Sequence, residues 1–370
     1  MYLSRGNCIF AIDEGVRAAD IYKHDEHDRK TEASDMAPTP GSKNLITDIA
    51  GLKVGNTHSA HHATGVTVLL PDDPVVAAVD VRGGAPGTRD VSALDPASLV
   101  DVVHGIVLSG GSVFGLDAAG GVISHLSEQG VGMSFGRSAL HIPIVPSAIL
   151  FDLTFGPDKS WGATPPYREL GIAAAKAAGS EFDLGNAGAG YGATAGMLKG
   201  GLGSASSVFG GFTVGALVAL NPVGSCINPA SNDLWARPFE LDGEFGPAPS
   251  PPAAPVPMTP LGGSKLDARA AGANTTIAVV ATDAVLTKAQ AHRLAIMASD
   301  GMARAIRPIH TPYDGDTVFA LATGSTALGE QPNEDLAMLG STAADCLSRA
   351  IGRAMASAEP LHGHDAWRPA

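Results

Sequence analysis

The stretch Gly272–Asp283, with the sequence GANTTIAVVATD, joins two segments of opposite character. Upstream lies a proline-rich leader at about residues 243–272, with seven prolines between positions 247 and 260. Such a composition does not form a core element. Downstream, the residues from Ile277 to Ala281 are apolar and rich in β-formers, which predicts a strand covered on both faces. A flexible leader therefore meets a rigid strand at Asn274-Thr275.

A cut between Asn274 and Thr275 would place a hydroxyl and a free α-amino group on one residue. A threonine hydroxyl is a weak nucleophile until a base takes its proton. An α-amino group has a pKa of about 7.7–8.0 and can act as that base near neutral pH. Holding base and hydroxyl on one residue removes most of the entropic cost of bringing them together. The stretch predicts a self-cleaving amide hydrolase, and the alternative is a threonine that simply begins a strand.

Composition bounds the fold and the partners. At 370 residues the chain could hold one large or two ordinary domains. It is 45% hydrophobic but only 5% aromatic, with 46 glycines, so its core must consist largely of Ala, Val, Leu and Ile packed around glycine turns. The net charge of −13 argues against binding to a nucleic-acid backbone or an anionic membrane surface.

The cysteines and the apolar runs indicate the compartment. Cys8, Cys226 and Cys346 have neither metal-site nor disulfide-framework spacing, which favours reduced thiols. The most apolar run, Val208 to Leu220, is too short to span a bilayer. No signal peptide is apparent. These features predict a cytoplasmic protein.

The first 44 residues are charged and aperiodic, and we expect a disordered N-terminal tail. Met36 lies just before the first organised segment, so the true start could be there. Residues 44–55 predict a strand and a turn. Gly65–Leu70 and Val75–Val81 are expected to pair with each other across a Pro-Asp-Asp-Pro turn.

The remaining pattern predicts strands and helices in a mixed order. The expected strands are Ile106–Leu108, Ser147–Thr154, Ser204–Ser207, Gly211–Leu220, Thr276–Thr282 and Thr317–Ala322, and the expected helices are Val113–Gln129 with Ser112 as its cap, Tyr167–Ala178, Lys288–Ile306 and Asp335–Ser357.

Two glycine-rich tracts draw attention to candidate site residues. The turn Ser109–Ser112 superficially suggests a phosphate cradle, but it lacks the spacing of known phosphate-binding loops, and close packing of helix on sheet is the better interpretation. Lys199 stands alone among glycines. It is either a solvated loop lysine or a positive group brought close to backbone and substrate.

Polar residues at strand ends are further candidates. Asn221 precedes Pro222, which is an ordinary turn signal, but its amide could also donate to a developing oxyanion. Asp314 and Asp316 flank Gly315 at the entry to a buried strand. They form either a simple Asp-Gly turn or a carboxylate pair that needs a cation nearby.

Taken together, seven segments in matching order resemble the DmpA-type aminopeptidases, a family that includes β-peptidyl aminopeptidases and nylon-oligomer hydrolases. The resemblance spans roughly residues 44–362. The segments that carry it are Arg82–Asp90 (RGGAPGTRD), Ser109–Leu116 (SGGSVFGL), Pro143–Ala148 (PIVPSA), Gly188–Gly200, Asn221–Gly224 (NPVG), Asn274–Thr276 (NTT) and Asp314–Thr317 (DGDT).

The resemblance implies an α+β fold, a four-layer αββα sandwich of the N-terminal-nucleophile hydrolase type. It implies one chain that cuts itself into an α piece, residues 45–274 after the tail, and a β piece, residues 275–370. By resemblance Thr275 is the nucleophile, Lys199 the catalytic lysine and Asn221 the oxyanion-hole asparagine. No cofactor and no metal are expected.

Two sets of residues stay open within the resemblance. Asp314 and Asp316 match paired acidic positions and could hold the Thr275 ammonium, tune its pKa or pair with a substrate amine. Some members carry a tyrosine near the oxyanion where this chain has Phe151, whose ring cannot donate a hydrogen bond. Candidate substitutes or substrate contacts are Tyr191, Tyr313, Gly110, Gly111 and Ser112.

The leading functional hypothesis is hydrolysis of a small peptide or amide through an acyl-Thr275 ester, of aminopeptidase type. One alternative is acyl transfer, as in the ornithine acetyltransferases of related fold, and another is hydrolysis of ω-amino-acid (nylon-type) oligomers. A binding protein without turnover is a further class, against which the intact Thr275, Lys199 and both aspartates argue. By resemblance we also expect a homo-oligomer, a tetramer of α/β units, with no nucleic-acid or membrane partner.

Overall fold

The computed structural model describes residues 37–157, 159–252, 254, 256, 258–268 and 274–368. The chain divides into two units, Met1–Pro38 and Thr39–Ala370, and everything below concerns the second. The expected disorder of residues 1–36, the alternative start at Met36 and the thiol of Cys8 lie outside the described residues. Thr39 pairs with Val208, so the chain packs against the body of the second unit already upstream of residue 45.

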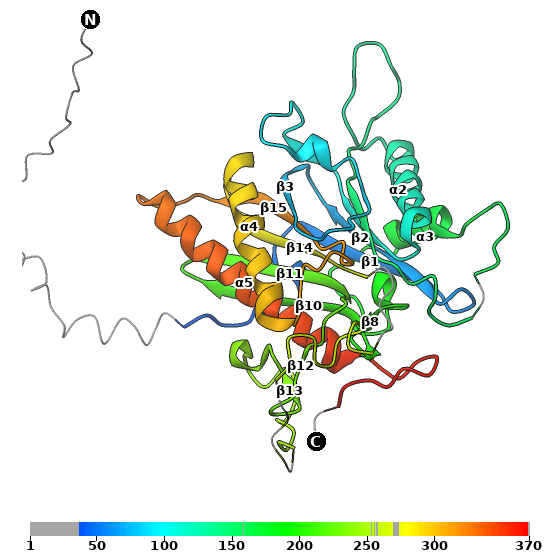
Figure 1. Cartoon of the computed structure of the whole chain (residues 1–370). Coiled ribbons are helices and arrows are strands. Elements are labelled where there is room, and N and C mark those ends of the chain that lie inside the picture. The colour runs from blue at the N-terminus through cyan, green and yellow to red at the C-terminus, as the bar shows by residue number, and fades with distance from the viewer. Residues whose placement is uncertain are drawn as a thin grey trace, which may run out of the picture. The chain divides into compact units, whose positions relative to one another are not determined.

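Two β-sheets form the centre of this unit (Figure 1). One has five strands in the order β1-β2-β6-β7-β4, and the other has six in the order β10-β11-β14-β15-β3-β5. Their strands are β1 (Leu52–Ser59), β2 (Thr64–Pro71), β3 (Val75–Val81), β4 (Thr88–Arg89), β5 (Val102–Val103), β6 (Ile106–Ser109), β7 (Ser147–Ile149), β10 (Gly201–Phe209), β11 (Phe212–Asn221), β14 (Thr275–Ala284) and β15 (Thr317–Thr326). Two further pairs are small, β8 (Thr194–Ala195) with β9 (Leu198–Lys199) and β12 (Ile227–Asn228) with β13 (Asp233–Leu234).

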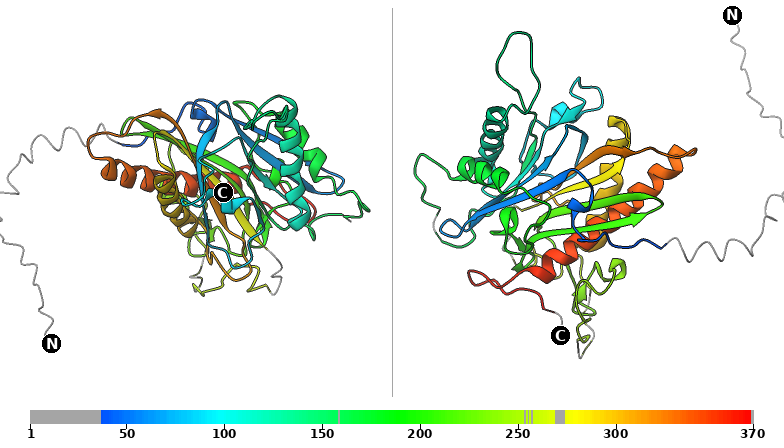
Figure 2. Two further views of the ribbon diagram at one scale, coloured as in Figure 1. Left: turned by 90° about the horizontal axis from the view of Figure 1, so that it is seen from above. Right: turned by 180° about the vertical axis from the view of Figure 1, so that it is seen from behind.

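Helices cover the outer face of each sheet (Figures 1 and 2). Helices α2 (Asp117–Glu128) and α3 (Tyr167–Lys176) pack on the five-stranded sheet, while α4 (Lys288–Ala305) and α5 (Pro332–Ser357) pack on the six-stranded one. One apolar cluster lies between the sheets, and one lies under each helix pair. The predicted four-layer αββα sandwich is therefore confirmed.

Strand β14 is buried on both faces, as its sequence predicts. Ile277, Val279 and Ala281 join the cluster between the two sheets. The alternate residues Ala278 and Val280 join the cluster under α4 and α5. Because β14 lies between β11 and β15, its first residue, Thr275, stands at the end of an inner strand of the six-stranded sheet.

The expected pairing of Gly65–Leu70 with Val75–Val81 is wrong. Strand β2 pairs with β1 and β6, whereas β3 pairs with β15 and β5 in the other sheet. Both segments are strands, but the Pro-Asp-Asp-Pro link carries the chain from one layer to the next. Each of the two strands pairs along most of its length with a different strand. All of β2 pairs with β1, and most of β3 pairs with β15.

Three local expectations also differ from the structure. Ser112 does not cap a helix, because it lies within a 3-10 turn with a φ of 52° and α2 begins only at Asp117. Residues 46–48 form a 3-10 helix instead of a strand. Strand β7 ends at Ile149, five residues before the expected end. The chain turns there to bring Asp152 to the backbone of Gly111.

Within the described residues, no helix is both long and apolar enough to cross a membrane. Cys226 and Cys346 are buried free thiols.

Candidate active site

Sheet pairing brings Thr275 and Asn221 together. Asn221 ends β11 and Thr275 begins β14, and the antiparallel register sets these two residues directly opposite each other. Such opposed residues have Cα atoms about 4.5–5.5 Å apart. The Thr275 hydroxyl is buried and donates a hydrogen bond to the carbonyl oxygen of Asn274. The hydroxyl is thus in contact with the peptide group that the sequence predicts to be cut.

The backbone of Asn274 is fixed by the loop before β15. Its N–H donates to the Tyr313 carbonyl at 3.0 Å, and its own carbonyl accepts from the Gly315 N–H at 2.9 Å. Residue 315 must be small, since a Cβ there would lie 2.7 Å from the Thr275 hydroxyl oxygen. The loop therefore supplies a donor to the Asn274 carbonyl and leaves room for the hydroxyl.

Asp314 holds the loop and the end of β11 together. One carboxylate oxygen accepts from the Val223 N–H at 2.9 Å, and the other accepts from the N–H and hydroxyl of Thr311 at 3.0 and 2.6 Å. Burial, reinforced by the charge of Asp316, raises the pKa of Asp314. Both carboxylate oxygens of Asp314 therefore accept hydrogen bonds from groups of the protein itself.

Asp316 lies beside Thr276, the residue that follows the predicted nucleophile. It accepts from the Thr276 N–H at 2.8 Å and from the His310 ring Nδ1 at 2.8 Å. His310 adds its backbone N–H at 3.1 Å. The sequence did not single out His310, although it stands in the same short segment as both aspartates. The two carboxylates thus have separate partners.

The side-chain amide of Asn221 spans two loops. Its nitrogen donates to the Phe151 carbonyl at 3.0 Å, and its oxygen accepts from the Thr194 N–H at 2.9 Å. Phe151 therefore contributes a backbone acceptor for Asn221, and its ring supplies no hydrogen-bond donor. These bonds fix the plane of the amide next to Thr275.

Lys199 is completely buried, which excludes the solvated-loop alternative. Its ammonium donates to the carbonyls of Gly190, Ala193 and Gly200 at 2.9–3.0 Å, and Thr275 is not among these partners. Burial lowers the pKa of Lys199 to about 7, and the charge of Asp152 opposes the shift. Through its bond to Ala193, Lys199 fixes the loop in which the following residue, Thr194, donates to the side chain of Asn221.

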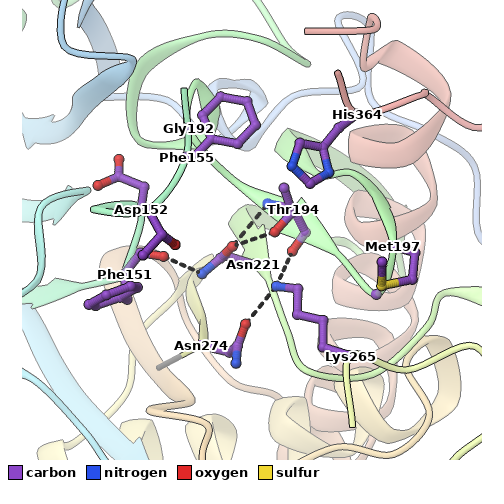
Figure 3. A pocket seen from close by; sticks show the side chains of 12 residues that line it. Phe151, Asp152, Phe155, Gly192, Thr194, Met197, Asn221, Lys265, Asn274 and His364 are labelled. Atoms are coloured by element: carbon purple, nitrogen blue, oxygen red, sulfur yellow. Dashed lines mark hydrogen bonds between the residues drawn. The ribbon is translucent and has the colours of Figure 1, made fainter. Parts of the chain in front are cut away.

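A second buried lysine, Lys265, lies in the leader itself. Its ammonium donates to the side-chain oxygen of Asn274 at 2.6 Å and to the Thr194 carbonyl at 3.0 Å (Figure 3). Burial lowers the pKa of Lys265 to about 7, and the charge of Asp314 opposes the shift. Lys265 is not recognisable as a site residue from sequence, because only its place nine residues before Asn274 sets it apart from other lysines.

A pocket of about 140 Å³ opens beside Asn274 (Figure 3). Its walls are Phe151, Asp152, Thr154, Phe155, Gly192, Thr194, Gly196, Met197, Asn221, Lys265, Asn274 and His364. The predicted residues Asn221 and Asn274 line it, together with Phe151, so the candidate site has a cavity next to the Asn274-Thr275 bond.

The comparison with protein families agrees with this geometry. The model of peptidase family S58 matches residues 44–368. The chain belongs to this family. An uncharacterized aminopeptidase of Mycobacterium tuberculosis (strain ATCC 25618 / H37Rv) is 43% identical over 345 residues, 88% of this S58 family member and 97% of the relative. A 6-aminohexanoate-oligomer endohydrolase of Agromyces sp. (strain KY5R) is 30% identical over 317 residues, 81% of each chain.

Solved structures confirm the fold of this S58 family member. A beta-aminopeptidase of Burkholderia sp. superposes with a TM-score of 0.65 at 22% identity, covering 91% of this chain and 95% of that one. The L-aminopeptidase D-Ala-esterase/amidase of Ochrobactrum anthropi, described as a variant of the Ntn hydrolase fold, gives 0.60 at 22% identity, with 86% and 88% covered. The predicted family, fold and peptidase-type hydrolase class are confirmed.

In this S58 family member the turn Gly110–Ser112 is hydrogen-bonded to segments of the protein near the pocket. The N–H groups of Gly110, Gly111 and Ser112 donate to Gly65, Asp152 and Leu150. Their predicted oxyanion role gains no support, since all three donors are used within the protein. Asp152, which no sequence motif marks as a site residue, is buried and also accepts from the Thr64 hydroxyl at 2.5 Å.

Tyr191 is placed apart from the other candidates. Its ring stacks on His58 with centroids 4.3 Å apart, and it does not line the pocket beside Asn274. Among the described residues, no group of three His, Cys, Asp or Glu side chains has the arrangement of a metal site. The catalytic roles of Thr275, Lys199 and Asn221 stay predictions.

Proposed function

We propose that this S58 family member is an aminopeptidase-type amide hydrolase that cuts itself between Asn274 and Thr275 and then uses Thr275 as its nucleophile. The observation that carries the proposal is the contact of the Thr275 hydroxyl with the Asn274 carbonyl. The position of Thr275 at the head of a rigid central strand, opposite Asn221, supports it further.

The self-cleavage begins with attack of the Thr275 oxygen on the Asn274 carbonyl carbon. The new C–O ester bond replaces the C–N bond, and the hydroxyl proton goes to the leaving nitrogen, which becomes the α-amino group of Thr275. Negative charge develops on the carbonyl oxygen, where the Gly315 N–H donates at 2.9 Å. Water then hydrolyses the ester and leaves pieces of 274 and 96 residues.

Turnover repeats this chemistry on an external amide. The freed α-amino group takes the hydroxyl proton, Thr275 forms an ester with the acyl part of the substrate, and the proton passes to the leaving amine. Water then hydrolyses the ester. Asn221 pairs with Thr275 across the two strands, and Asp316 accepts a hydrogen bond from the N–H of Thr276. We assign both residues the role of fixing the position of Thr275.

The substrate is proposed to be a small peptide or amide, because the chain belongs to peptidase family S58 and its 43% identical relative is named an aminopeptidase. The relative named as a 6-aminohexanoate-oligomer endohydrolase supports linear amide oligomers as a second substrate candidate. Both substrates need the same acyl-threonine ester.

Intact mass spectrometry with N-terminal sequencing tests the self-cleavage. We expect the wild-type chain to give two pieces, the smaller one beginning Thr-Thr-Ile, and Thr275→Ala to give one uncut chain. Wild-type protein that stays whole after long incubation would remove the proposal.

Cleaved protein then serves to test the substrate class. Aminoacyl amides, 6-aminohexanoate oligomers and N-acetylated peptides are compared at equal concentration, with Thr275→Ala as the blank. Hydrolysis of none of them favours a binding protein. A rate that rises well above hydrolysis when an amine acceptor is added favours acyl transfer.

A further inference from the structure

Lys265 is an unusual residue for a leader segment, because it is almost fully buried. Only 7% of its surface is exposed, and its ammonium donates to the Asn274 side-chain oxygen at 2.6 Å. Burying an ammonium ion is costly unless hydrogen bonds replace its water. Its second bond, to the Thr194 carbonyl at 3.0 Å, completes a bridge between the leader and the pocket wall.

The backbone of Lys265 is held as firmly as its side chain. Its N–H donates to the Val223 carbonyl at 3.0 Å, and the Val223 N–H in turn donates to Asp314. At the other end, Thr194 donates its N–H to Asn221. The lysine is therefore fixed to the two segments that also hold Asp314 and Asn221.

We propose that Lys265 is a positioning residue for the self-cleavage, which orients Asn274 so that its carbonyl carbon faces the Thr275 hydroxyl. The inference rests on the proposed cut at Asn274-Thr275. The backbone of Asn274 is already fixed at its N–H and its carbonyl. The bond from Lys265 to the side chain adds a further point of attachment, which restrains Asn274 on its side-chain side.

Orientation of this kind matters because attack requires the reacting atoms to be close and aligned. Before the cut no α-amino group exists at Thr275, so the uncut chain depends on the fixed geometry of Asn274 and on the groups around it. Lys265 lies upstream of the cut and remains with Asn274 in the larger piece.

The test follows the self-cleavage of chains made by pulsed cell-free translation. We expect Lys265→Met to slow the appearance of the smaller piece at least tenfold. The matched control is Lys288→Met, since Lys288 is 8% exposed and its ammonium likewise donates two hydrogen bonds, both of them to backbone carbonyls, those of Ala93 and Ser98. We expect this control to cleave within twofold of wild type.

A double-mutant cycle separates positioning from a general loss of structure. If Lys265 acts through the Asn274 side chain, Lys265→Met adds less than a twofold effect in an Asn274→Ala background. An equal slowing in both backgrounds would overturn the inference, as would wild-type rates in Lys265→Met. Those results leave the proposed function standing, whereas a wild-type chain that never cleaves removes both.

Discussion

At the scale of the residue, the site is built from buried charged groups whose hydrogen bonds are made to the protein frame. Asp314 and Asp316 each have donors on both oxygens, and the ammonium of Lys199 has three carbonyl acceptors. Such groups are costly to bury and leave little freedom to the loops that carry them. The candidate nucleophile thus lies in a rigid polar surrounding.

Lys199 gives a pH-dependent prediction. Burial lowers its pKa to about 7, while a lysine in an unfolded chain titrates near about 10.4. Between these values the unfolded state binds more protons than the folded one, so this lysine makes the free energy of unfolding rise with pH. We expect the free energy of unfolding of the chain with the wild-type Lys199 side chain, compared with that of Lys199→Met, to rise by about 1–2 kcal/mol between pH 7 and pH 9.

Denaturant unfolding at both pH values measures this gain, with both chains carrying Thr275→Ala so that one uncut chain unfolds. A difference that stays constant with pH would mean that the three carbonyls keep the ammonium protonated throughout the range.

At the scale of the element, two glycine-containing loops meet at the head of β14. The loop of Gly83 lies so close to the Asp314–Asp316 turn that a Cβ on Gly83 would come within 2.2 Å of the Asp316 nitrogen. The Ala85 N–H donates to the Asp314 carbonyl at 2.8 Å. Glycine at position 83 therefore allows the backbone of the Arg82–Asp90 tract to approach the backbone of the Asp314–Asp316 turn. This contact supports the position of Gly315, whose N–H donates to the Asn274 carbonyl.

Gly315→Ala tests this arrangement. The added Cβ would meet the Ala85 carbonyl oxygen and the Thr275 hydroxyl oxygen, each at 2.7 Å, so one of them must move. We expect self-cleavage to slow at least tenfold, measured as the time course of the smaller piece on denaturing gels. Gly179→Ala is the control, because the nearest atom to its Cβ lies 3.8 Å away. Equal rates in both variants would contradict the prediction.

At the scale of the whole described unit, the proposed cut falls inside one continuous sheet. The smaller piece would contain β14, α4, β15 and α5, and its two strands pair with β11 and β3 of the larger piece. The apolar clusters on both sides of the sheet also include residues from both pieces. Because none of these contacts is the Asn274-Thr275 peptide bond itself, we expect the cut to leave them in place.

We therefore expect the two pieces to stay together after cleavage. Cleaved protein should elute from a size-exclusion column in one peak that contains both bands, and the pieces should separate only in denaturant. Elution of a free 96-residue piece under native conditions would show that the shared sheet does not hold them.

Local sequence pattern was sufficient for the elements with clear periodicity. Strand β14, helix α4 and strand β3 lie where their apolar patterns predict them. The pairing of β2 and β3 could not be predicted in the same way, because a turn signal reports that the chain changes direction and not which strand lies beside it. The two strands belong to different sheets.

The sequence by itself determined the strand that begins at Thr275, the order of its polar motifs and, through resemblance, the αββα fold. Only the tertiary structure decided that Lys265 and Asp152 belong to the site and that Lys199 is bonded to carbonyls rather than to solvent. The physical reason is that strand patterns are local, whereas the partner of a buried charge is set by segments far away in the chain.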